Sequence, residues 1–446
     1  FFLLAARVCQ VDGGFGFIAT KTIAEGRSRK VGIEQLINQG WTVYRAIRSR
    51  YWPGSANVVI AQVWMSKQEW ETDSILDDRV VRGVTAALRR RGRVDGQPFA
   101  LAENKGQCFQ GSILRGSGFI VSREYSKQLI ESNELYGEVL FPFLSGRDLN
   151  SSPFLEASRW VINFSDMNES KARSYADCWE IVETKVRPER NRRNAQGDYV
   201  VGRPERDRYW IYSAPRPVLY GKLKDLDETI VLPQTSGTVQ PAIVKVSQVF
   251  SDGLNVCPSS SMGLFGVLTS SFHWHWVEHY APRMKADIRY SPTYVFMPFP
   301  RCRYTDELES VARDLHLARI ETMRTLEIGL TNLYNRMANC EDKDPSIALM
   351  RDWQVRIDEA VCNAYEFSDL SLNHGYIESS QGMRYTMCPG VQEEVLDRLL
   401  ELNHLRYAEE VEAGLHQGAG ATLATTPAKQ RTRRDPDAQM LFEEGE

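Results

Sequence analysis

The sequence predicts an α/β protein built from three consecutive parts, and three changes of pattern along the chain show where they lie. Residues 15–65 hold a strand, a helix and two strands, an order typical of an α/β sheet. From about residue 126 to 300, short β-rich runs alternate with loops marked by proline and glycine, which favours an α+β domain. From residue 304, apolar residues recur at spacings of three or four, which predicts helices.

The first part begins with an apolar run after a Gly-Gly turn, and this run predicts a buried strand. Its expected elements are a strand at 15–20, a helix at 31–38, strands at 41–47 and 57–65, and a helix at 77–90 that ends near Gly92. The two later strands are joined by a loop that contains Trp52-Pro53-Gly54, and Pro-Gly is a strong turn signal.

The other two parts follow from the same reasoning. The middle part is expected to hold strands at 210–212, 229–232 and 242–246 and a helix at 264–277. The C-terminal part is expected to hold helices at 308–337, from Asp344-Pro345 through Val361, and from Val391 to about Glu412. Residues 416–446 are rich in small and charged residues without periodicity, which predicts a disordered tail.

Composition limits the class of protein. The 446 residues are 42% hydrophobic and 25% charged, as expected for an ordinary globular protein of two or three domains. No apolar run approaches the ~20 residues that a membrane span requires, and the apolar start at 1–6 lacks the basic flank of a signal peptide. The eight cysteines contain no CxxC pair, which favours reduced thiols in the cytoplasm. Because residue 1 is not methionine, we expect the chain to lie inside a longer protein.

Charge is concentrated locally. The net charge is −4, so the chain lacks the overall basic character of many nucleic-acid binders. Two arginine clusters stand out, one at 89–93 and one at Arg187, Arg190, Arg192, Arg193, Arg203, Arg206 and Arg208, whereas residues 393–412 are acidic. Each cluster is compatible with phosphate binding, and equally with a solvated helix face or loop.

Two motif matches fail on their context. Gly14-Phe-Gly16-Phe-Ile-Ala19 satisfies GxGxxA, but in a dinucleotide site that motif follows a strand and opens a helix. His275 and His279 are four residues apart, but the glutamate does not follow the first histidine as a zinc protease requires, and no cysteine cluster completes a site. We therefore expect a turn before a strand, an aromatic-rich helix that packs on a sheet, and no metal.

A family resemblance rests on longer runs of sequence. Residues 141–153 read Phe-Pro-Phe-Leu-Ser-Gly-Arg-Asp-Leu-Asn-Ser-Ser-Pro, and Arg-Trp-Val-Ile-Asn-Phe follows at 159–164. Together with 247–252 and 285–300, these runs resemble the target-recognition domain of MmeI-like, type IIG-like adenine DNA methyltransferases in restriction–modification and phage-defence systems. Residues 104–112 resemble the segment that joins the two domains of such proteins.

The resemblance implies a domain plan and an activity. Residues 1–125 would complete a Rossmann-like methyltransferase domain, 126–300 would recognise double-stranded DNA, 301–415 would form a helical domain, and 416–446 a tail. The activity implied is site-specific methylation of adenine N6 with S-adenosylmethionine. The glycine-rich cofactor loop and the Asn-Pro-Pro-Tyr/Phe loop that this chemistry needs are missing from the sequence, so the cofactor would be bound mainly by residues outside it.

The resemblance also suggests site residues. Trp52, with Tyr51 as a substitute, would stack on the flipped adenine, since base stacking on an aromatic ring offsets part of the cost of extrusion. On physical grounds alone Trp52 is equally well explained as a packed Trp-Pro turn. Phosphates would be held by Arg187, Arg190, Arg192, Arg193, Lys285 and Arg289.

Base edges would be read by Thr235, Ser236, Thr238 and Gln240, because hydroxyls and amides hydrogen-bond to bases. An ordinary polar turn is the alternative for these four residues. For the whole chain, two other possibilities stay open: a non-catalytic DNA-recognition subunit of a multi-protein defence complex, which would bring other defence proteins as partners, and an interaction module built on the C-terminal helices.

Overall fold

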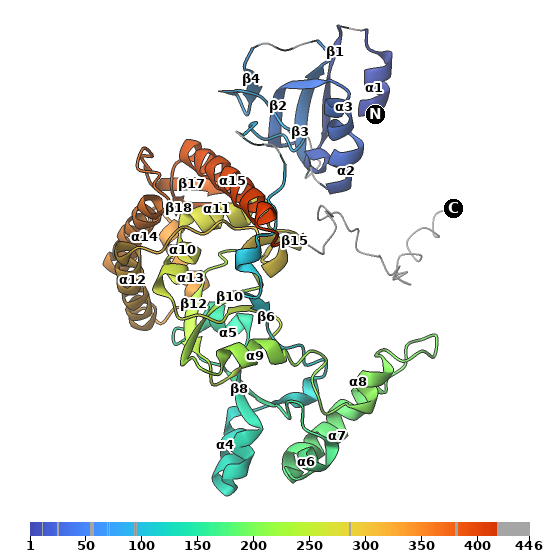
Figure 1. Cartoon of the computed structure of the whole chain (residues 1–446), viewed down its shortest axis with the longest axis vertical. Coiled ribbons are helices and arrows are strands. Elements are labelled where there is room, and N and C mark those ends of the chain that lie inside the picture. The colour runs from blue at the N-terminus through green and yellow to red at the C-terminus, as the bar shows by residue number, and fades with distance from the viewer. Residues whose placement is uncertain are drawn as a thin grey trace.

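The computed structural model describes residues 1–416, except residues 11, 25, 54–57, 69, 71, 93, 95, 285–286 and 380–381. Figure 1 shows a small N-terminal α/β unit at one end of the long axis, a central sheet with the C-terminal helices in the middle, and a further lobe at the other end. Below, the lobe is called the distal lobe (residues 112–213), and residues 301–416 are called the C-terminal layer.

The N-terminal unit is a five-stranded sheet with helices on one face. Its elements are α1 (Phe2–Val8), β1 (Gly14–Thr20), α2 (Gly26–Val31), α3 (Ile33–Asn38), β2 (Thr42–Tyr51), β3 (Val59–Ser66), β4 (Ser74–Leu76) and β5 (Arg79–Val81), with the strands in the order β1-β3-β2-β4-β5. Strand β3 lies between β1 and β2 and runs antiparallel to both. Ile33, Trp41 and Val63 are among the buried residues that form its core.

Two expectations for this unit are wrong. Strand β1 is an edge strand with alternating exposure, not a buried strand, because only one of its faces meets the core. Residues 77–90 form no helix. Asp77 and Asp78 have φ values of 49° and 62°, outside the helical region, and they turn the chain between β4 and β5. The Asp77 carboxylate accepts hydrogen bonds from the backbone N–H (2.8 Å) and Nε (2.5 Å) of Arg48, which holds this turn against β2.

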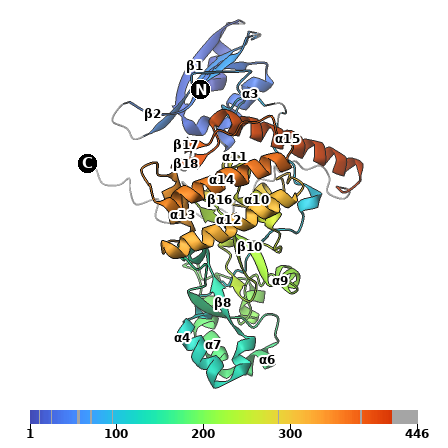
Figure 2. The same cartoon turned by 90° about the vertical axis from the view of Figure 1, so that its left-hand side faces the viewer.

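The central sheet is antiparallel, in the order β12-β10-β14-β6. Its strands are β6 (Phe109–Gln110), β10 (Glu228–Pro233), β12 (Ala242–Lys245) and β14 (Leu254–Cys257). The sheet packs on helices α10 (Met262–Thr269), α11 (Ser271–Tyr280), α12 (Asp306–Thr325), α13 (Leu330–Ala338) and α14 (Pro345–Ala364). One continuous cluster of buried residues joins strands and helices, so the C-terminal layer shares its core with the central sheet (Figure 2).

The C-terminal layer contains one element that the periodicity did not predict. Strands β17 (Gly375–Ser379) and β18 (Gly382–Thr386) form a hairpin between α14 and α15 (Pro389–Glu412). The hairpin places Arg384 against the central part of the molecule, where its Nη2 donates to the Gly237 carbonyl. A 3.6-residue pattern cannot reveal a short polar hairpin of this kind.

The distal lobe has a second core. Its sheet, ordered β13-β8-β9-β7, contains β7 (Ile120–Val121), β8 (Leu140–Leu144), β9 (Arg159–Ile162) and β13 (Val249–Phe250). Its helices are α4 (Arg123–Ser132), α6 (Glu169–Arg173), α7 (Ala176–Arg190) and α8 (Arg203–Asp207), whereas α5 (Gly146–Ser151) falls in the same residue range but packs on β10 and α13 in the central core. Phe164, Trp179 and Trp210 are buried together in this core. Strand β13 runs parallel to β8 and connects the lobe to the central sheet.

Two further expectations need correction. Residues 210–212 are not a strand but a buried loop, because the Trp210 Nε1 and the Tyr212 hydroxyl donate to the Met167 and Ile162 carbonyls and anchor the loop in the core. Residues 264–277 are not one helix. Ser270 has an extended backbone that ends α10, and its hydroxyl accepts from His273 N to begin α11.

Helix α15 holds the N-terminal unit and the chain that follows it. The Arg90 guanidinium lies 2.6 Å from the Asp397 carboxylate and within 4.0 Å of Glu393 and Glu394. Asn403 exchanges two hydrogen bonds with the Phe99 backbone, and the Glu410 carboxylate accepts from two N–H groups at 102–103. The acidic residues of α15 therefore form ion pairs with Arg90, which belongs to the arginine cluster at 89–93. None of the helices in the described ranges combines the length and the apolar composition that a membrane crossing requires.

Candidate nucleic-acid interface

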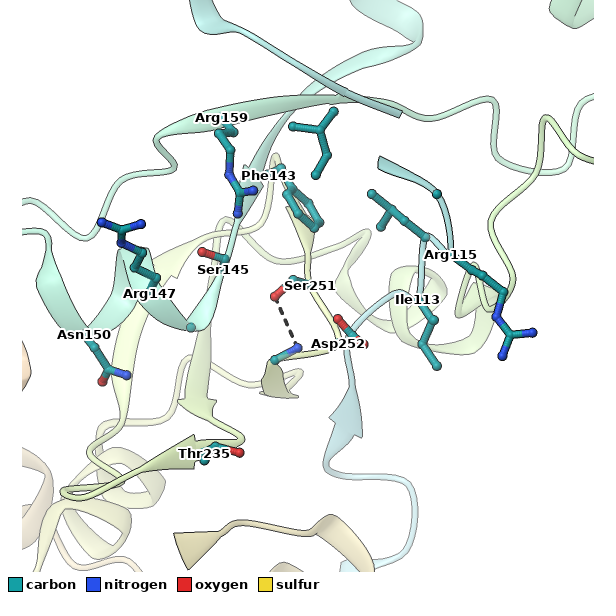
Figure 3. Close-up of a pocket in the computed structure, with 15 residues that line it drawn as sticks. Ile113, Arg115, Phe143, Ser145, Arg147, Asn150, Arg159, Thr235, Ser251 and Asp252 are labelled. Carbon is teal, nitrogen blue, oxygen red and sulfur yellow. Dashed lines mark hydrogen bonds between the residues drawn. The ribbon is translucent and has the colours of Figure 1, made fainter. Parts of the chain in front are cut away.

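An open cleft of about 680 Å³ lies where the distal lobe meets the central sheet. Its lining residues are Ile113, Leu114, Arg115, Gly116, Ile120, Phe143, Ser145, Gly146, Arg147, Asn150, Arg159, Thr235, Ser251, Asp252 and Gly253. Figure 3 shows Arg147, Arg159 and Asn150 on one side, Arg115 on the other, and Ser251 and Asp252 between them. Most of these residues come from the runs at 141–164 and 247–252 that the sequence singled out.

Helix α5 forms one wall because Asp148 fixes its first turn. The buried Asp148 carboxylate accepts from Ser145 N at 3.0 Å, from Ser145 Oγ at 2.7 Å and from Ser158 Oγ at 2.6 Å, while Ser145 Oγ caps the helix. This reciprocal arrangement is a capping box. It orients the short helix so that Arg147 and Asn150 border the cleft.

The cleft carries excess positive charge. Three guanidinium groups, from Arg115, Arg147 and Arg159, line it together with one carboxylate, from Asp252. The Arg159 guanidinium lies 5.7 Å from the centre of the Phe143 ring, and Arg115 pairs with Glu205 at 3.1 Å. Arginines that line a concave surface attract phosphates, and the amide of Asn150 and the hydroxyl of Thr235 suit base edges.

The floor of the cleft is a crossing of two backbones. Ser112 N donates to the Phe250 carbonyl at 2.8 Å, and Ser251 N donates to the Leu144 carbonyl at 2.9 Å. A Cβ atom on Gly111 would lie 2.1 Å from the Ser251 carbonyl oxygen, so no larger residue fits there. These hydrogen bonds fix the distal lobe relative to the central sheet beneath the cleft.

The arginine-rich stretch forms an arm beside the cleft. Residues 191–200 are all exposed, and together with α7 and α8 they project from the lobe (Figure 1). The Tyr199 ring lies between two guanidinium groups, with Arg193 4.0 Å and Arg206 3.7 Å from its centre. Arg187 is exposed and pairs with Glu183, and Arg192 is exposed as well.

Arg190 does not belong to this exposed group. Its side chain is 1% exposed and donates to the carbonyls of Leu114, Arg115, Glu205 and Ile211 at 2.9–3.1 Å. Burial lowers the pKa of its guanidinium. The expectation that Arg190 contacts phosphate is therefore wrong, because its donors are used inside the protein. Arg190 instead supports the cleft wall at Leu114 and Arg115.

The expected base-reading tip is mostly buried. Thr235 lines the cleft, but Ser236, Thr238 and Gln240 are 3–7% exposed and lie beneath the C-terminal layer. The expectation that these three side chains meet base edges is wrong, because β11 (Thr235–Ser236) pairs with β16 (Asp287–Arg289) and Arg384 bonds to the Gly237 carbonyl that follows it, so the three side chains are buried. Polar composition suggested an exposed hairpin tip, but the C-terminal layer covers it.

The remaining expected residues have mixed outcomes. Arg289 is exposed on β16, directly opposite Thr235 in the strand pairing, whereas Lys285 lies outside the described residues. Trp52 is 41% exposed at the end of β2, where its backbone N–H donates to the Val58 carbonyl. Residues 54–57 of that loop and the side chain of Tyr51 also lie outside the described part.

Sequence reasoning missed the arginines of the cleft itself. Arg147 and Arg159 stand inside the runs at 141–153 and 159–164, so a signal existed. The sequence around Arg115 gave no such signal. Arg115 reaches the cleft because Arg190 binds its carbonyl oxygen and because its own backbone has a φ of 48°.

The histidines of α11 serve the core. His275 Nε2 lies 3.1 Å from the Thr386 hydroxyl, and burial with nearby Arg89 lowers the pKa of His279. In the described ranges, no cluster of three or more His, Cys, Asp or Glu side chains is arranged to hold a metal ion.

Comparison with known proteins agrees with this geometry. Residues 103–302 match the family model described as the MmeI target recognition domain. The fold resembles the solved structure of the type IIL restriction-modification enzyme MmeI in complex with DNA, with 16% identity and a TM-score of 0.59 over 90% of this chain. This chain spans only 50% of that structure. The type IIG restriction endonuclease BpuSI aligns with 13% identity over 83% of this chain and 49% of its own, at a TM-score of 0.30. No curated protein sequence matches the chain.

Proposed function

We propose, from the MmeI-type target recognition domain at residues 103–302, that this chain binds double-stranded DNA in the cleft and reads its sequence. In this proposal it is the recognition half of a site-specific DNA adenine-N6 methyltransferase of a restriction–modification or phage-defence system, acting in the cytoplasm. The observation that carries the proposal is the arginine-lined cleft, which is built from the matched domain's own residues.

The cleft offers both kinds of contact that a sequence reader needs. Arg147 and Arg159 on one wall, with Arg192 and Arg193 of the arm that follows α7, would hold phosphates and set the position of the duplex. Asn150 and Thr235 would meet base edges, since amides and hydroxyls discriminate bases in the grooves.

The N-terminal unit supports the methyltransferase part of the proposal. Along the chain, this unit has a strand, then helices, then two strands that pair with each other. This order agrees with the end of a methyltransferase sheet, which is what the family resemblance implies. Trp52 stands at the end of β2 with much of its ring in solvent, which suits stacking on an extruded adenine. S-adenosylmethionine does not fit the residues present, because neither loop that would hold it occurs in the sequence. No methyl-transfer step is therefore assigned to these residues.

Charge reversal in the cleft tests DNA binding. The double variant Arg147→Glu/Arg159→Glu should weaken binding to random duplex and lower the slope of log K against log salt by about 0.9 for each phosphate that it no longer neutralises. Arg313→Glu, on the exposed side of α12, is the matched control and should leave the slope unchanged. An unchanged slope in the double variant would remove the cleft from the DNA interface.

Replacing the stacking residue tests the base-flipping role. In the protein that also carries the catalytic loops, Trp52→Ala should reduce methylation at least about tenfold, since base stacking is worth roughly 1–3 kcal/mol. Affinity for DNA should change by less than a factor of about two, because phosphate contacts dominate affinity. Methylation at the normal rate would show that Trp52 only packs.

A non-catalytic recognition subunit is the second candidate. The matched target recognition domain supports it as well, because reading DNA through this domain requires no methyl transfer. Transfer of labelled methyl groups to DNA by the natural full-length protein distinguishes the two. Sequence-selective binding without methyl transfer, restored by other defence proteins, would favour the subunit.

A further inference from the structure

The segment between β10 and β12 links the cleft to the C-terminal layer. It runs from Thr235, which lines the cleft, to Pro241, and we call it the 235–241 connection. No residue of the C-terminal layer is among those that line the cleft. The connection is thus a route by which that layer can affect the cleft without touching DNA.

Two arginines of the C-terminal layer hold the connection, Arg319 fully buried and Arg384 partly buried. Arg384 of β18 donates from Nη2 to the Gly237 carbonyl at 2.9 Å, and Arg319 of α12 donates from Nη2 to the Pro241 carbonyl at 2.8 Å. Arg319 is fully buried, and burial lowers the pKa of Arg384. The charge of Glu278 acts in the opposite sense and raises the pKa of Arg384, so it offsets part of the effect of burial. Burying a cation is costly unless it is hydrogen-bonded, so both side chains depend on these carbonyl groups for their position.

The backbone between these two contacts is strained. Val239 has a φ of 43°, a left-handed conformation that a β-branched residue rarely adopts. Such strain persists only where the surroundings enforce it, and it occurs often at binding sites and switches. The two arginines bracket Val239, with Gly237 two residues before it and Pro241 two residues after it.

Polar groups also lie beside the connection, at the edge of the core that contains Val239 and Trp274. A cavity of about 30 Å³ lies among residues that include Gln240, Trp274 and Arg384. Gln240 Oε1, Trp274 Nε1 and Arg384 Nε are buried without a hydrogen-bond partner. One acceptor and two donors around a space of this size match the needs of an ordered water. The contact between the connection and the C-terminal layer is therefore partly polar.

A second contact brings the same layer against the cleft wall. Gly329, between α12 and α13, lies so close to the end of α5 that a Cβ there would be 2.4 Å from the Asn150 carbonyl oxygen. Asn150 and Thr235, both assigned to base edges, are therefore each backed by the C-terminal layer.

We infer that Arg384 and Arg319 are positioning residues for base reading: they hold the 235–241 connection in its strained form and so place Thr235 in the cleft. The inference rests on the proposed function. Its consequence is that sequence selectivity depends on a layer that makes no contact with the DNA, whereas affinity for random duplex does not.

The test measures selectivity and affinity separately in the full-length protein. Binding to a randomised duplex library, followed by sequencing, gives the preferred site, and titration gives affinity for that site and for random duplex. Arg384→Ala should lower the ratio of the two affinities about tenfold, the scale of one base contact, and leave affinity for random duplex within about twofold. Arg384→Lys keeps the charge and should recover part of the ratio. Arg313→Ala on the exposed side of α12 should change neither value.

The outcomes distinguish failure of this inference from failure of the proposed function. An unchanged ratio in Arg384→Ala, or an equal loss of both affinities, overturns the inference while the proposed function stands. A natural protein that binds all duplexes alike overturns both. If Arg384→Ala fails to fold, Arg384→Lys carries the test, together with hydrogen exchange of the amides at 236–240. Those amides should exchange faster while the amides of β10 keep their rates, and equal rates at 236–240 would overturn the inference.

Discussion

The arginines between 187 and 193 are close in sequence but differ in what they contact. Arg187 and Arg192 are exposed, Arg193 lies on the Tyr199 ring, and Arg190 is buried among four carbonyl groups. The difference follows from helix geometry, because Arg190 falls on the same face of α7 as the buried Val186 and Val182. Composition alone therefore cannot separate a phosphate-binding arginine from a structural one.

The Arg190→Met variant should be strongly destabilised. It leaves carbonyl groups of Leu114, Arg115, Glu205 and Ile211 without this donor, and each buried unsatisfied group costs about 1–3 kcal/mol. We expect a loss of at least about 3 kcal/mol in the free energy of unfolding, measured by urea denaturation. Arg192→Met is the neighbouring exposed control, with an expected change of about 0.5 kcal/mol or less. Equal stability of the two variants would contradict the burial argument.

His273 should make stability depend on pH. It is buried, its ring nitrogens contact the Leu268 carbonyl and the Tyr290 hydroxyl, and burial lowers its pKa from 6.5 to about 4. Its contribution is complete above pH 6.5 and is lost as pH falls toward 4, because the unfolded chain binds the proton first. Between pH 7 and 5 the free energy of unfolding should fall by about 2 kcal/mol more in the natural protein than in His273→Gln. Identical urea midpoints at both pH values in the two proteins would disprove this.

At the scale of elements, regular periodicity was a dependable guide and irregular structure was not. The strands at 229–232 and 242–246 and the helices α14 and α15 were predicted from the regular spacing of their apolar residues. The helix expected over 308–337 is instead two helices, α12 and α13, because the chain leaves the helical conformation at 326–329, where Glu327 has a φ of 51°. The hairpin of β4 and β5 at 74–81 was missed because positive φ values at Asp77 and Asp78 leave no periodic trace. For the loop at 210–212, aromatic residues suggested a strand but serve as anchors in the core.

The residues of the cleft show the same limit of prediction from sequence. Thr235 was predicted as a base reader and lines the cleft, and Arg147 and Arg159 lie in runs that the sequence marked as informative, whereas Arg115 reaches the cleft only when distant segments fold together. The polar residues at 236–240 were expected in solvent, and only the fold reveals that the C-terminal layer covers them.

Helix α5 depends on Asp148, and Asp148→Asn tests that dependence. An amide in place of the carboxylate turns an N–H₂ group toward the donors of Ser145 or Ser158, so about 1–3 kcal/mol should be lost. Hydrogen exchange at 146–151 should accelerate, and DNA affinity should fall with it because Arg147 loses its fixed position. Asp225→Asn, at an exposed carboxylate, should have no effect. Unchanged exchange in α5 would show that the cap does not hold the helix.

At the scale of the whole molecule, α15 connects the N-terminal unit to the rest through charge. Arg90 meets Asp397, Glu394 and Glu393, and the Gly92 backbone approaches the Asp397 carboxylate so closely that a Cβ would lie 2.4 Å away. Figure 1 shows the N-terminal unit joined to the middle of the molecule at this end of α15. These contacts fix the last part of the N-terminal unit against α15.

Asp397→Asn should loosen this connection without unfolding the cores. Because the pair is partly exposed, global stability should change by about 1 kcal/mol or less. The chain at 91–100 should be cleaved several times faster in limited proteolysis. Glu409→Gln, exposed on the same helix, is the control. Identical cleavage rates in the two variants would show that the charges do not orient the unit.

The continuous core beneath the central sheet has a practical consequence for engineering specificity. Phe265 and Val267 of the matched domain are buried with Leu308, Ala312 and Ile357 of the helices that follow. In a chimera that receives only residues 103–302, this domain would pack against the C-terminal helices of the recipient protein. The side chains on the two sides of the core would then not match, and the transplanted domain would pack poorly. A graft that extends through residue 416 keeps both sides of the joint from one parent, so we expect exchange of the longer unit to transfer specificity.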